Sequence, residues 1–313
     1  MFFRQISEKK NFQVVAVNDL GDVENLAYLL KYDTVYGRFD GNLPSYIFQE
    51  RDPANLPWKK LGIDIVVEAT GAFDSYEEAQ VHLKAGAKRV VITAPAKDED
   101  GSLGKTVLMG VNEKDLAQCK ISSNGSCTTN SIAPVIQVLD EEIGVAKAIL
   151  NTAHGYTATQ SLVDGPTKGK DVRRGRAAAQ NIIPSSTGAA IAVARAVRQM
   201  EKKFDGIALR VPVAAGSIAD ITFLAKRKTS AEEVNKILKK VAALPRFKNV
   251  LQVTEDPVVS SDILRQPYGA IVDLALTRVV DGDLVKVLSW YDNEWGYVAT
   301  LVRHVEEAVK TLG

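Results

Sequence analysis

The sequence changes character at Ser122-Ser123-Asn124-Gly125-Ser126-Cys127-Thr128-Thr129-Asn130, a run of small polar residues that holds one cysteine. Apolar residues recur at helical spacing after this run: Ile132, Val135, Ile136, Leu139 and Ile143. The spacing predicts a helix with Cys127 at its N-terminus. Unpaired backbone N–H groups and the positive end of the helix dipole stabilise a thiolate there. We therefore expect Cys127 to be a nucleophile with a lowered pKa.

The residues on the two sides of this run follow different patterns. Before it, strand-like runs rich in Val and Ile alternate with helical patterns; the runs are residues 13–17, 63–68, 89–93 and 107–111, and the helical patterns are residues 23–30 and 76–85. This alternation is typical of βαβ units around a parallel sheet. After it, period-two runs at residues 207–213, 217–224 and 284–290 accompany helical patterns at residues 189–203 and 231–243. The second half therefore predicts a mixed sheet with helices on one face, and the whole chain an α/β protein.

His154 is the candidate partner of Cys127. It follows residues 146–152, which predict a strand. A histidine within hydrogen-bond reach of a cysteine can take the thiol proton and activate the sulfur. A cysteine hydrolase would use the same pair and is the alternative that the pair by itself leaves open. Cys119 lies before a predicted strand and is expected to be an inert core residue.

The bulk composition fits an enzyme of a reducing compartment. A chain of 313 residues is long enough for two domains. Its 39 basic and 38 acidic residues form no charge block, so nucleic acid is not expected as the main partner. Two cysteines cannot build a disulfide framework, which favours the cytoplasm. We also expect no membrane segment and no metal site, because apolar runs are short and His82 and His304 lack metal-ligand spacing.

Five motifs follow one another from the cysteine onward. They are Ser-Cys-Thr-Thr-Asn (126–130), His-Gly-Tyr-Thr-Ala-Thr-Gln (154–160), Pro-Ser-Ser-Thr-Gly-Ala-Ala (184–190), Leu-Arg-Val-Pro-Val (209–213) and Ser-Trp-Tyr-Asp-Asn-Glu-Trp-Gly-Tyr (289–297). Together they resemble phosphorylating glyceraldehyde-3-phosphate dehydrogenase. The resemblance implies a Rossmann-type, doubly wound parallel sheet in a dinucleotide-binding domain, residues 1–126, and an α+β catalytic domain with a mixed sheet, residues 127–293. It also implies that a C-terminal helix, residues 294–313, packs back on the first domain.

The resemblance implies NAD-dependent oxidative phosphorylation of glyceraldehyde 3-phosphate to 1,3-bisphosphoglycerate, in glycolysis or gluconeogenesis. Cys127 would form a thiohemiacetal and then a thioester, while His154 would act as the base. Ser126, Thr128, Thr187 and Gly188 would contact the attacking phosphate; Thr157 and Arg210, assisted by Arg174, would bind the substrate phosphate. The residues agree, because Ser185 to Gly188 precede a predicted helix, whose N-terminus attracts anions. Capping of that helix is the alternative role of Thr187.

The expected cofactor is NAD. Asp19 ends a strand-like run, as a carboxylate that binds the adenosine ribose does, and it would repel the additional phosphate of NADP. By resemblance, Arg51 lies near the adenosine, Asn293 fixes the nicotinamide carboxamide, and Tyr297 lies close by. Thr70, Gly71 and Thr93 follow predicted strands at the carboxyl edge, where α/β sheets bind ligands. NADP stays open, because Lys168 and Lys170 of a neighbouring subunit could tolerate a phosphate.

The glycine-rich turn that should precede Asp19 by about 20 residues is not in this sequence. Phe2, Phe3 and Ile6 look like one apolar face of the first helix, so we expect a strand and a phosphate loop upstream. Without them, the chain is expected to fold poorly or to bind cofactor weakly. Two alternatives remain: erythrose-4-phosphate dehydrogenase, which favours water over phosphate, and a non-catalytic binding protein. The 158–180 loop resembles one that packs between subunits, which implies a homotetramer.

Overall fold

The computed structural model describes residues 1–167, 169 and 171–312. The chain divides into two compact units. The first contains Met1–Val107, Glu113–Gly125 and the chain from Leu301 onward; the second contains Leu108–Asn112 and Ser126–Thr300. Each unit is built around its own sheet system, which agrees with the change of pattern at the Cys127 run.

The strands of the first unit pair mainly in parallel, as the sequence predicts. β1 (Ala16–Asn18) pairs with β4 (Tyr46–Phe48), and a second sheet has the order β5 (Ile65–Glu68), β6 (Arg89–Ile92), β8 (Ile121–Ser123) and β7 (Lys105–Thr106). A short antiparallel pair joins β2 (Tyr32–Asp33) to β3 (Gly37–Arg38). The parallel strands thus form two sheets instead of one, because within the described residues β1 pairs only with β4 and β5 only with β6.

Short helices surround these strands. They are α1 (Phe2–Ile6), α2 (Val23–Lys31), α3 (Trp58–Leu61), α4 (Tyr76–Lys84), and the 3-10 turns η1 (Pro53–Asn55) and η2 (Glu113–Gln118). Tyr76 of α4 packs with Val90, Ile92 and Ile121 in one core cluster. In another cluster, Phe2 and Phe12 pack against β5, together with Leu301 and Val305 from the final helix.

The second unit is organised by a seven-stranded mixed sheet. Its order is β10 (Ile183–Ser186), β11 (Phe204–Val211), β9 (Val145–Gly155), β12 (Ser217–Ala225), β15 (Leu284–Tyr291), β14 (Ala270–Val280) and β13 (Leu251–Thr254). β9 and β11 run parallel, whereas β12 is antiparallel to both β9 and β15. The predicted mixed sheet is therefore confirmed.

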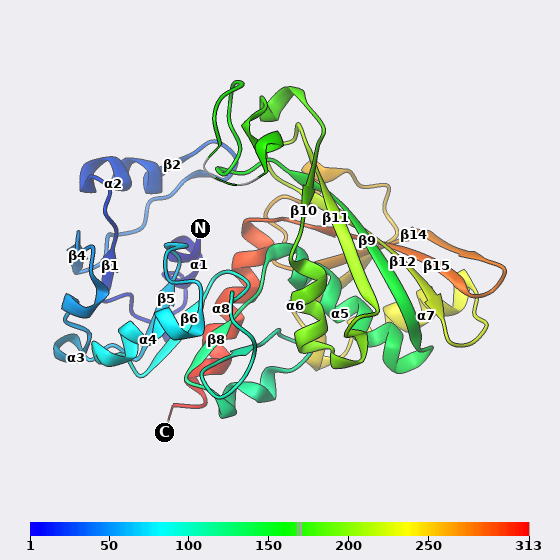
Figure 1. Ribbon diagram of the computed structural model, residues 1–313, viewed down its shortest axis with the longest axis horizontal. Helices are drawn as coiled ribbons and strands as arrows, with labels where there is room; N and C mark the ends of the chain where they lie inside the picture. Colours follow the sequence, from blue (N-terminus) through cyan, green and yellow to red (C-terminus); the bar gives the residue numbers. More distant parts are fainter. Residues whose placement is uncertain (168, 170, 313) are drawn as a thin grey trace. The chain divides into compact units, whose positions relative to one another are not determined.

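Helices α5 (Cys127–Glu142), α6 (Ala189–Ala196) and α7 (Ala231–Ala242) pack against this sheet (Figure 1). α8 (Trp295–Val309) follows β15, and 3-10 turns occupy the connections: η3 (Val172–Gly175), η4 (Ala178–Gln180), η5 (Arg198–Met200), η6 (Pro245–Phe247) and η7 (Ser260–Ile263). α5 is almost fully buried from Thr128 to Leu139. Cross-strand partners place Ile149, Ile207 and Leu284 on one sheet face, where all three side chains are exposed.

Among the described residues, no helix is both long enough and apolar enough to cross a membrane.

Candidate active site

Cys127 is the first residue of α5, as the sequence predicts. Ser126 caps this helix, and its Oγ accepts a hydrogen bond from the backbone N–H of Thr129 at 3.0 Å. The cap fixes the turn that carries the sulfur, because it satisfies one of the free N–H groups of the first helical turn. Cys127 as a whole residue is half-buried.

His154 lies beside the sulfur, with Nε2 3.3 Å from Cys127 Sγ. The histidine is near the end of β9, and its direct partner on the neighbouring strand β11 is Arg210. Cross-strand partners point to the same face of a sheet. His154 is 27 residues from Cys127 in the sequence, and Arg210 is 56 residues from His154. The sheet thus brings a base and a cation close to one thiol.

Two contacts of His154 Nδ1 correspond to different tautomers of the ring. Nδ1 lies 2.8 Å from Arg210 Nη1 and 2.6 Å from the carbonyl oxygen of Gly155. Arginine only donates, so the first contact requires an unprotonated Nδ1 and leaves the ring proton on Nε2. The second contact requires the proton on Nδ1 and leaves Nε2 free to accept. The position of Arg210 therefore decides whether His154 can take a proton from the sulfur.

The ring of His154 is neutral at pH 7. Burial, followed by the charges of Arg210 and Arg174, lowers its pKa to about 4, although the Gly155 carbonyl acts in the opposite direction. Only 4% of the residue is exposed. A neutral imidazole is the form that a general base needs.

The expected lowering of the Cys127 pKa is wrong. Burial of the thiol raises its pKa, and this outweighs the stabilisation of the thiolate by the backbone N–H and hydroxyl of Thr128 and by the charge of Arg210. The helix-terminal donors are thus present as expected, but their effect is smaller than that of desolvation. The thiol is the resting form, so proton transfer to His154 must accompany its attack.

A cluster of hydroxyl groups and arginines lies next to this pair. Arg174 donates to Ser185 Oγ from Nη2 at 2.8 Å and to Thr159 Oγ1 from Nη1 at 3.2 Å. Thr157 Oγ1 lies 3.0 Å from Thr159 Oγ1. Arg210 adds a buried Nε with no hydrogen-bond partner in the described part of the chain. The charges of Arg174 and Arg210 are close enough that Arg174 lowers the pKa of Arg210, after burial, which has the larger effect. Two near cations and an unpaired donor suit an anionic group.

Thr187 and Gly188 lie at the start of α6, where the sequence places an anion site. Thr187 Oγ1 accepts from the N–H of Ala189, the first residue of α6, at 3.2 Å, although the N-cap residue itself is Gly188. The Thr187 hydroxyl proton can still be donated. Gly188 is exposed, and the space around its Cα is open. Capping and anion binding are therefore compatible at this position.

Tyr291 is a site residue that could be placed from the sequence only within a motif. Its hydroxyl lies 2.9 Å from Thr128 Oγ1 and 2.8 Å from Thr152 Oγ1, and its ring packs edge-on to His154, with the centroids 5.9 Å apart. It is fully buried, and burial raises its pKa. Tyr291 therefore holds both Thr128 and His154. The hydroxyl of Thr128, which is buried, shares a hydrogen bond with that of Tyr291.

The predicted cofactor residues are divided between the two units. Asn293 lies in the second unit, buried, and its Oδ1 accepts from Gly216 N and Ser217 Oγ, both at 3.0 Å. These bonds orient the amide so that its NH₂ group is the remaining donor. Tyr297 is half-buried in the first turn of α8.

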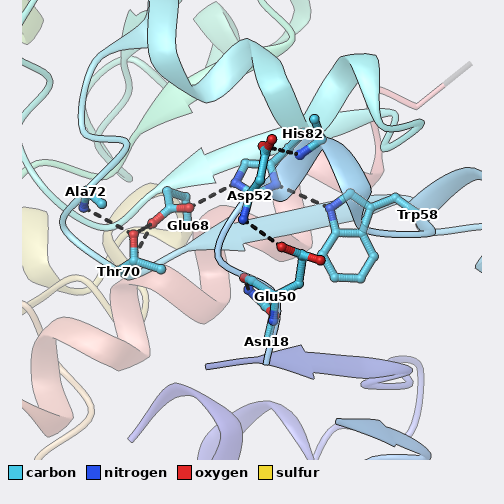
Figure 2. A network of polar contacts seen from close by, with 9 residues as sticks. Asn18, Glu50, Asp52, Trp58, Glu68, Thr70, Ala72 and His82 are labelled. Carbon is cyan, nitrogen blue, oxygen red and sulfur yellow. Dashed lines mark hydrogen bonds and ion pairs between the residues drawn. The ribbon is translucent and has the colours of Figure 1, made fainter. Parts of the chain in front are cut away.

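In the first unit, Asp19 and Arg51 follow the ends of the paired strands β1 and β4. The Asn18 side chain joins the two ends, because Nδ2 donates to Glu50 O and Oδ1 accepts from Glu50 N, both at 2.9 Å (Figure 2). Asp19 is exposed, and its Oδ1 accepts from Gly21 N at 2.8 Å. An exposed carboxylate and a nearby arginine at a carboxyl strand edge fit the sugar and base of a dinucleotide.

Thr70, Gly71 and Thr93 follow β5 and β6, which are neighbours in the parallel sheet. Gly71 has a φ of +71°, a conformation that favours glycine, and open space surrounds its Cα. Glu68, whose role the sequence did not indicate, accepts from Thr70 N at 2.7 Å and from the Thr70 hydroxyl (Figure 2). The turns after β5 and β6 thus leave room for a cofactor to approach the backbone closely.

Lys168 and Lys170, on which the NADP alternative depends, lie outside the described residues. Over the described part of the chain, no group of His, Cys, Asp and Glu side chains could hold a metal ion. Cys119 is buried, and burial raises its pKa, as expected for an inert thiol.

Comparisons with known proteins agree with these observations. The family model described as "Glyceraldehyde 3-phosphate dehydrogenase, C-terminal domain" matches residues 126–293, and the one described as "Glyceraldehyde 3-phosphate dehydrogenase, NAD binding domain" matches residues 1–76. The glyceraldehyde-3-phosphate dehydrogenase of Thermotoga maritima is 47% identical over 325 residues, which cover 99% of this chain and 96% of the relative.

Two further relatives have similar coverage. The glyceraldehyde-3-phosphate dehydrogenase of Streptomyces coelicolor is 46% identical over 96% of this chain and 92% of its own length. Glyceraldehyde-3-phosphate dehydrogenase 2 of Bacillus subtilis is 43% identical over 99% of this chain and 94% of its own length. With both family models and near-complete relatives in agreement, the chain belongs to the glyceraldehyde-3-phosphate dehydrogenase family.

Proposed function

We propose that this protein oxidises glyceraldehyde 3-phosphate to 1,3-bisphosphoglycerate with NAD and inorganic phosphate, through a thioester on Cys127. The observation that carries the proposal is the Cys127–His154 pair beside the two arginines and the hydroxyl cluster. A hydrolase would need the pair alone. A phosphorylating dehydrogenase needs the pair together with two anion sites.

The first step is attack of the sulfur on the aldehyde carbon. The Cys127 thiol gives its proton to His154 Nε2, 3.3 Å away, as the carbon–sulfur bond forms. The aldehyde oxygen becomes the hydroxyl of a thiohemiacetal, helped by the donors at the start of α5 and by His154. The raised pKa of Cys127 and the lowered pKa of His154 suit this coupled transfer, because each group is neutral before the substrate arrives.

Arg210 connects substrate binding to this step. In contact with Nδ1 of His154, it keeps the ring proton on Nε2 and prevents proton acceptance there. A substrate phosphate bound by Arg210, Arg174 and Thr157 would draw the guanidinium away. His154 could then donate from Nδ1 to Gly155 O and accept at Nε2. The base would thus become competent when the phosphate of the substrate is in place.

Bound NAD supplies the hydride acceptor for the oxidation that follows. His154 takes the hydroxyl proton of the thiohemiacetal, and the carbon becomes that of a thioester. In the second step, inorganic phosphate attacks this carbon, and the sulfur leaves and is reprotonated. Thr187 and Gly188 at the start of α6, with Ser126 and Thr128, are the residues that would hold the attacking phosphate. This second anion site favours phosphate over water, and therefore favours this activity over an erythrose-4-phosphate dehydrogenase.

The residues that would hold the cofactor are Asp19 at the ribose, Arg51 near the adenosine, Thr70, Gly71 and Thr93 at the carboxyl edge, and Asn293 at the carboxamide, with Tyr297 nearby. The Asp19 carboxylate favours NAD, because it would repel the 2′-phosphate of NADP. Residues 1–126 would form the cofactor domain and residues 127–293 the catalytic domain.

The test is NADH formation by the purified chain with glyceraldehyde 3-phosphate, NAD and phosphate. The Cys127→Ser variant should lose turnover, and His154→Asn should slow it strongly without loss of NAD binding. Dehydrogenase activity retained by Cys127→Ser would refute the thioester route. A wild-type protein that binds NAD but never reduces it would support the binding-protein alternative.

We also propose a cytoplasmic homotetramer. The exposed sheet face with Ile149, Ile207 and Leu284, and the exposed Leu162 and Val172 of the 158–180 loop, supply apolar surface for contacts between subunits. Light scattering should give a mass of about four times the 34.0 kDa of one chain. A monomer mass at micromolar concentration would contradict this.

A further inference from the structure

A buried chain of polar contacts lies in the first unit, outside the residues assigned above. Trp58 Nε1 lies 3.2 Å from His82 Nδ1, and His82 Nε2 lies 2.9 Å from Glu68 Oε2 (Figure 2). Trp58, Glu68 and His82 are each no more than 5% exposed. They come from α3, β5 and α4. Polar groups this deep in a core are costly unless each is paired, so their arrangement is specific.

Trp58 and the Glu68 carboxylate both require the proton of His82 to lie on Nε2. The indole N–H can only donate, so its bond requires an unprotonated Nδ1. The ring proton then lies on Nε2 and is donated to the Glu68 carboxylate. The contact between His82 and Glu68 is thus a hydrogen bond that the ring N–H donates to a carboxylate oxygen.

Glu68 connects His82 to the turn after β5 through hydrogen bonds. Oε2 faces His82, while Oε1 accepts from the backbone N–H and the hydroxyl of Thr70. Thr70 Oγ1 in turn accepts from Ala72 N at 3.1 Å, so the bonds continue around Gly71 (Figure 2). Burial alone would raise the pKa of Glu68, but the hydrogen bonds from His82 and Thr70 outweigh it and lower the pKa. The carboxylate is thus charged and hydrogen-bonded to both His82 and Thr70.

We infer that Trp58, His82 and Glu68 act as positioning residues that set the Thr70–Gly71 turn in the shape that binds the dinucleotide. The inference rests on the proposed function, which places Thr70 and Gly71 at the cofactor. None of the three side chains needs to touch the cofactor. Their effect is on cofactor affinity, because a turn that is already ordered loses less conformational freedom when the ligand binds.

Trp58→Phe is the sharpest test, because it removes the indole N–H and keeps an aromatic ring. His82 Nδ1 then loses its partner, and only the bond from Nε2 to Glu68 still orients the ring. We expect the NAD dissociation constant, measured by calorimetry, to rise about threefold to tenfold, the effect of one net hydrogen bond. The turnover number at saturating NAD and the KM for glyceraldehyde 3-phosphate should stay at the wild-type values.

Two variants of His82 should differ in NAD binding: one should lose affinity and the other should retain it. His82→Leu removes the donor to a buried carboxylate and should weaken NAD binding about tenfold or more, since bonds to charged groups are stronger. His82→Gln retains an N–H donor at similar reach and should bind NAD within about threefold of wild type. These variants also decide the question if Trp58→Phe does not fold.

Leu83→Ala is the matched control for a general loss of stability. Leu83 follows His82 on α4, packs on the neighbouring core cluster and has no polar contact with the three residues. It should lower the melting temperature and leave the NAD dissociation constant unchanged. If wild type binds NAD but Trp58→Phe and His82→Leu bind it equally well, the inference is overturned and the proposed function stands. If wild type does not bind NAD at all, both are overturned.

Discussion

Replacement of Arg210 by leucine separates substrate recognition from the chemistry of the thiol. The guanidinium is half-buried, faces His154 and has an unpaired Nε. In the proposed mechanism it binds the phosphate of the substrate. A hydrogen bond to a charged group contributes about 1.5–3 kcal/mol, which corresponds to about 10-fold to 150-fold in kcat/KM. Arg210→Leu should therefore lower kcat/KM for glyceraldehyde 3-phosphate by this factor.

The comparison substrate is glyceraldehyde, which has no phosphate for Arg210 to bind. Its kcat/KM should not fall by this factor, because it has no phosphate bond to lose. Release of His154 Nδ1 from Arg210 should leave it unchanged or raise it. Arg176→Leu is the control variant. Arg176 lies outside β11, just after η3, and is paired with Asp164 at 2.8 Å. Its side chain is 62% exposed, so both substrates should be processed at wild-type rates.

The same variant should alter the titration of the catalytic pair. Arg210 favours the Cys127 thiolate and lowers the pKa of His154, so its removal should raise both pKa values. The rate of Cys127 alkylation by iodoacetamide, followed against pH, should then rise at higher pH than in wild type. Equal losses for both substrates, together with an unshifted alkylation profile, would refute the role of Arg210 at both the phosphate and the base.

Other predictions concern stability, the second anion site and cofactor choice. His154 and His304 are buried, and burial is the main cause that lowers their pKa values to about 4 and about 3. The unfolded chain therefore binds more protons than the folded chain at acidic pH. The free energy of unfolding should fall as pH falls from about 6.5 toward 3, by up to about 1.4 kcal/mol per pH unit for each histidine. Chemical denaturation at several pH values should show this slope reduced in His304→Gln, and an unchanged slope would contradict it. Thr187→Val should raise the KM for inorganic phosphate several-fold with little change in the KM for the aldehyde, because only the attacking phosphate uses this hydroxyl; equal effects on both would exclude the assignment. Asp19→Ala should improve the NADP-to-NAD ratio of kcat/KM, because a repelling carboxylate is removed, and an unaltered ratio would argue against ribose binding by Asp19.

The local features of the site were predictable from the sequence. The helix start at Cys127 follows from apolar spacing and from Ser126, which supplies the cap. The strand that carries His154 follows from its β-rich composition. These predictions succeed because capping and periodicity involve residues within one or two turns of each other.

Features that depend on tertiary packing could not be predicted. The Cys127 pKa is raised because several distant segments bury the thiol, and no neighbour in the sequence reveals that burial. The contact of Arg210 with His154 depends on the pairing of β9 with β11. The contacts of His82 could not be predicted either, because its two partners, Trp58 and Glu68, are 24 and 14 residues away in the sequence.

The thioester on Cys127 is tested most directly by rapid mixing of the purified protein with NAD and glyceraldehyde 3-phosphate in the absence of phosphate. The mechanism predicts a burst of about one NADH per Cys127, followed by a slow phase, because the acyl group stays on the sulfur until phosphate attacks it. Addition of phosphate should restore fast turnover. Continuous NADH formation at the full rate without phosphate, or a burst that persists in Cys127→Ser, would contradict the account.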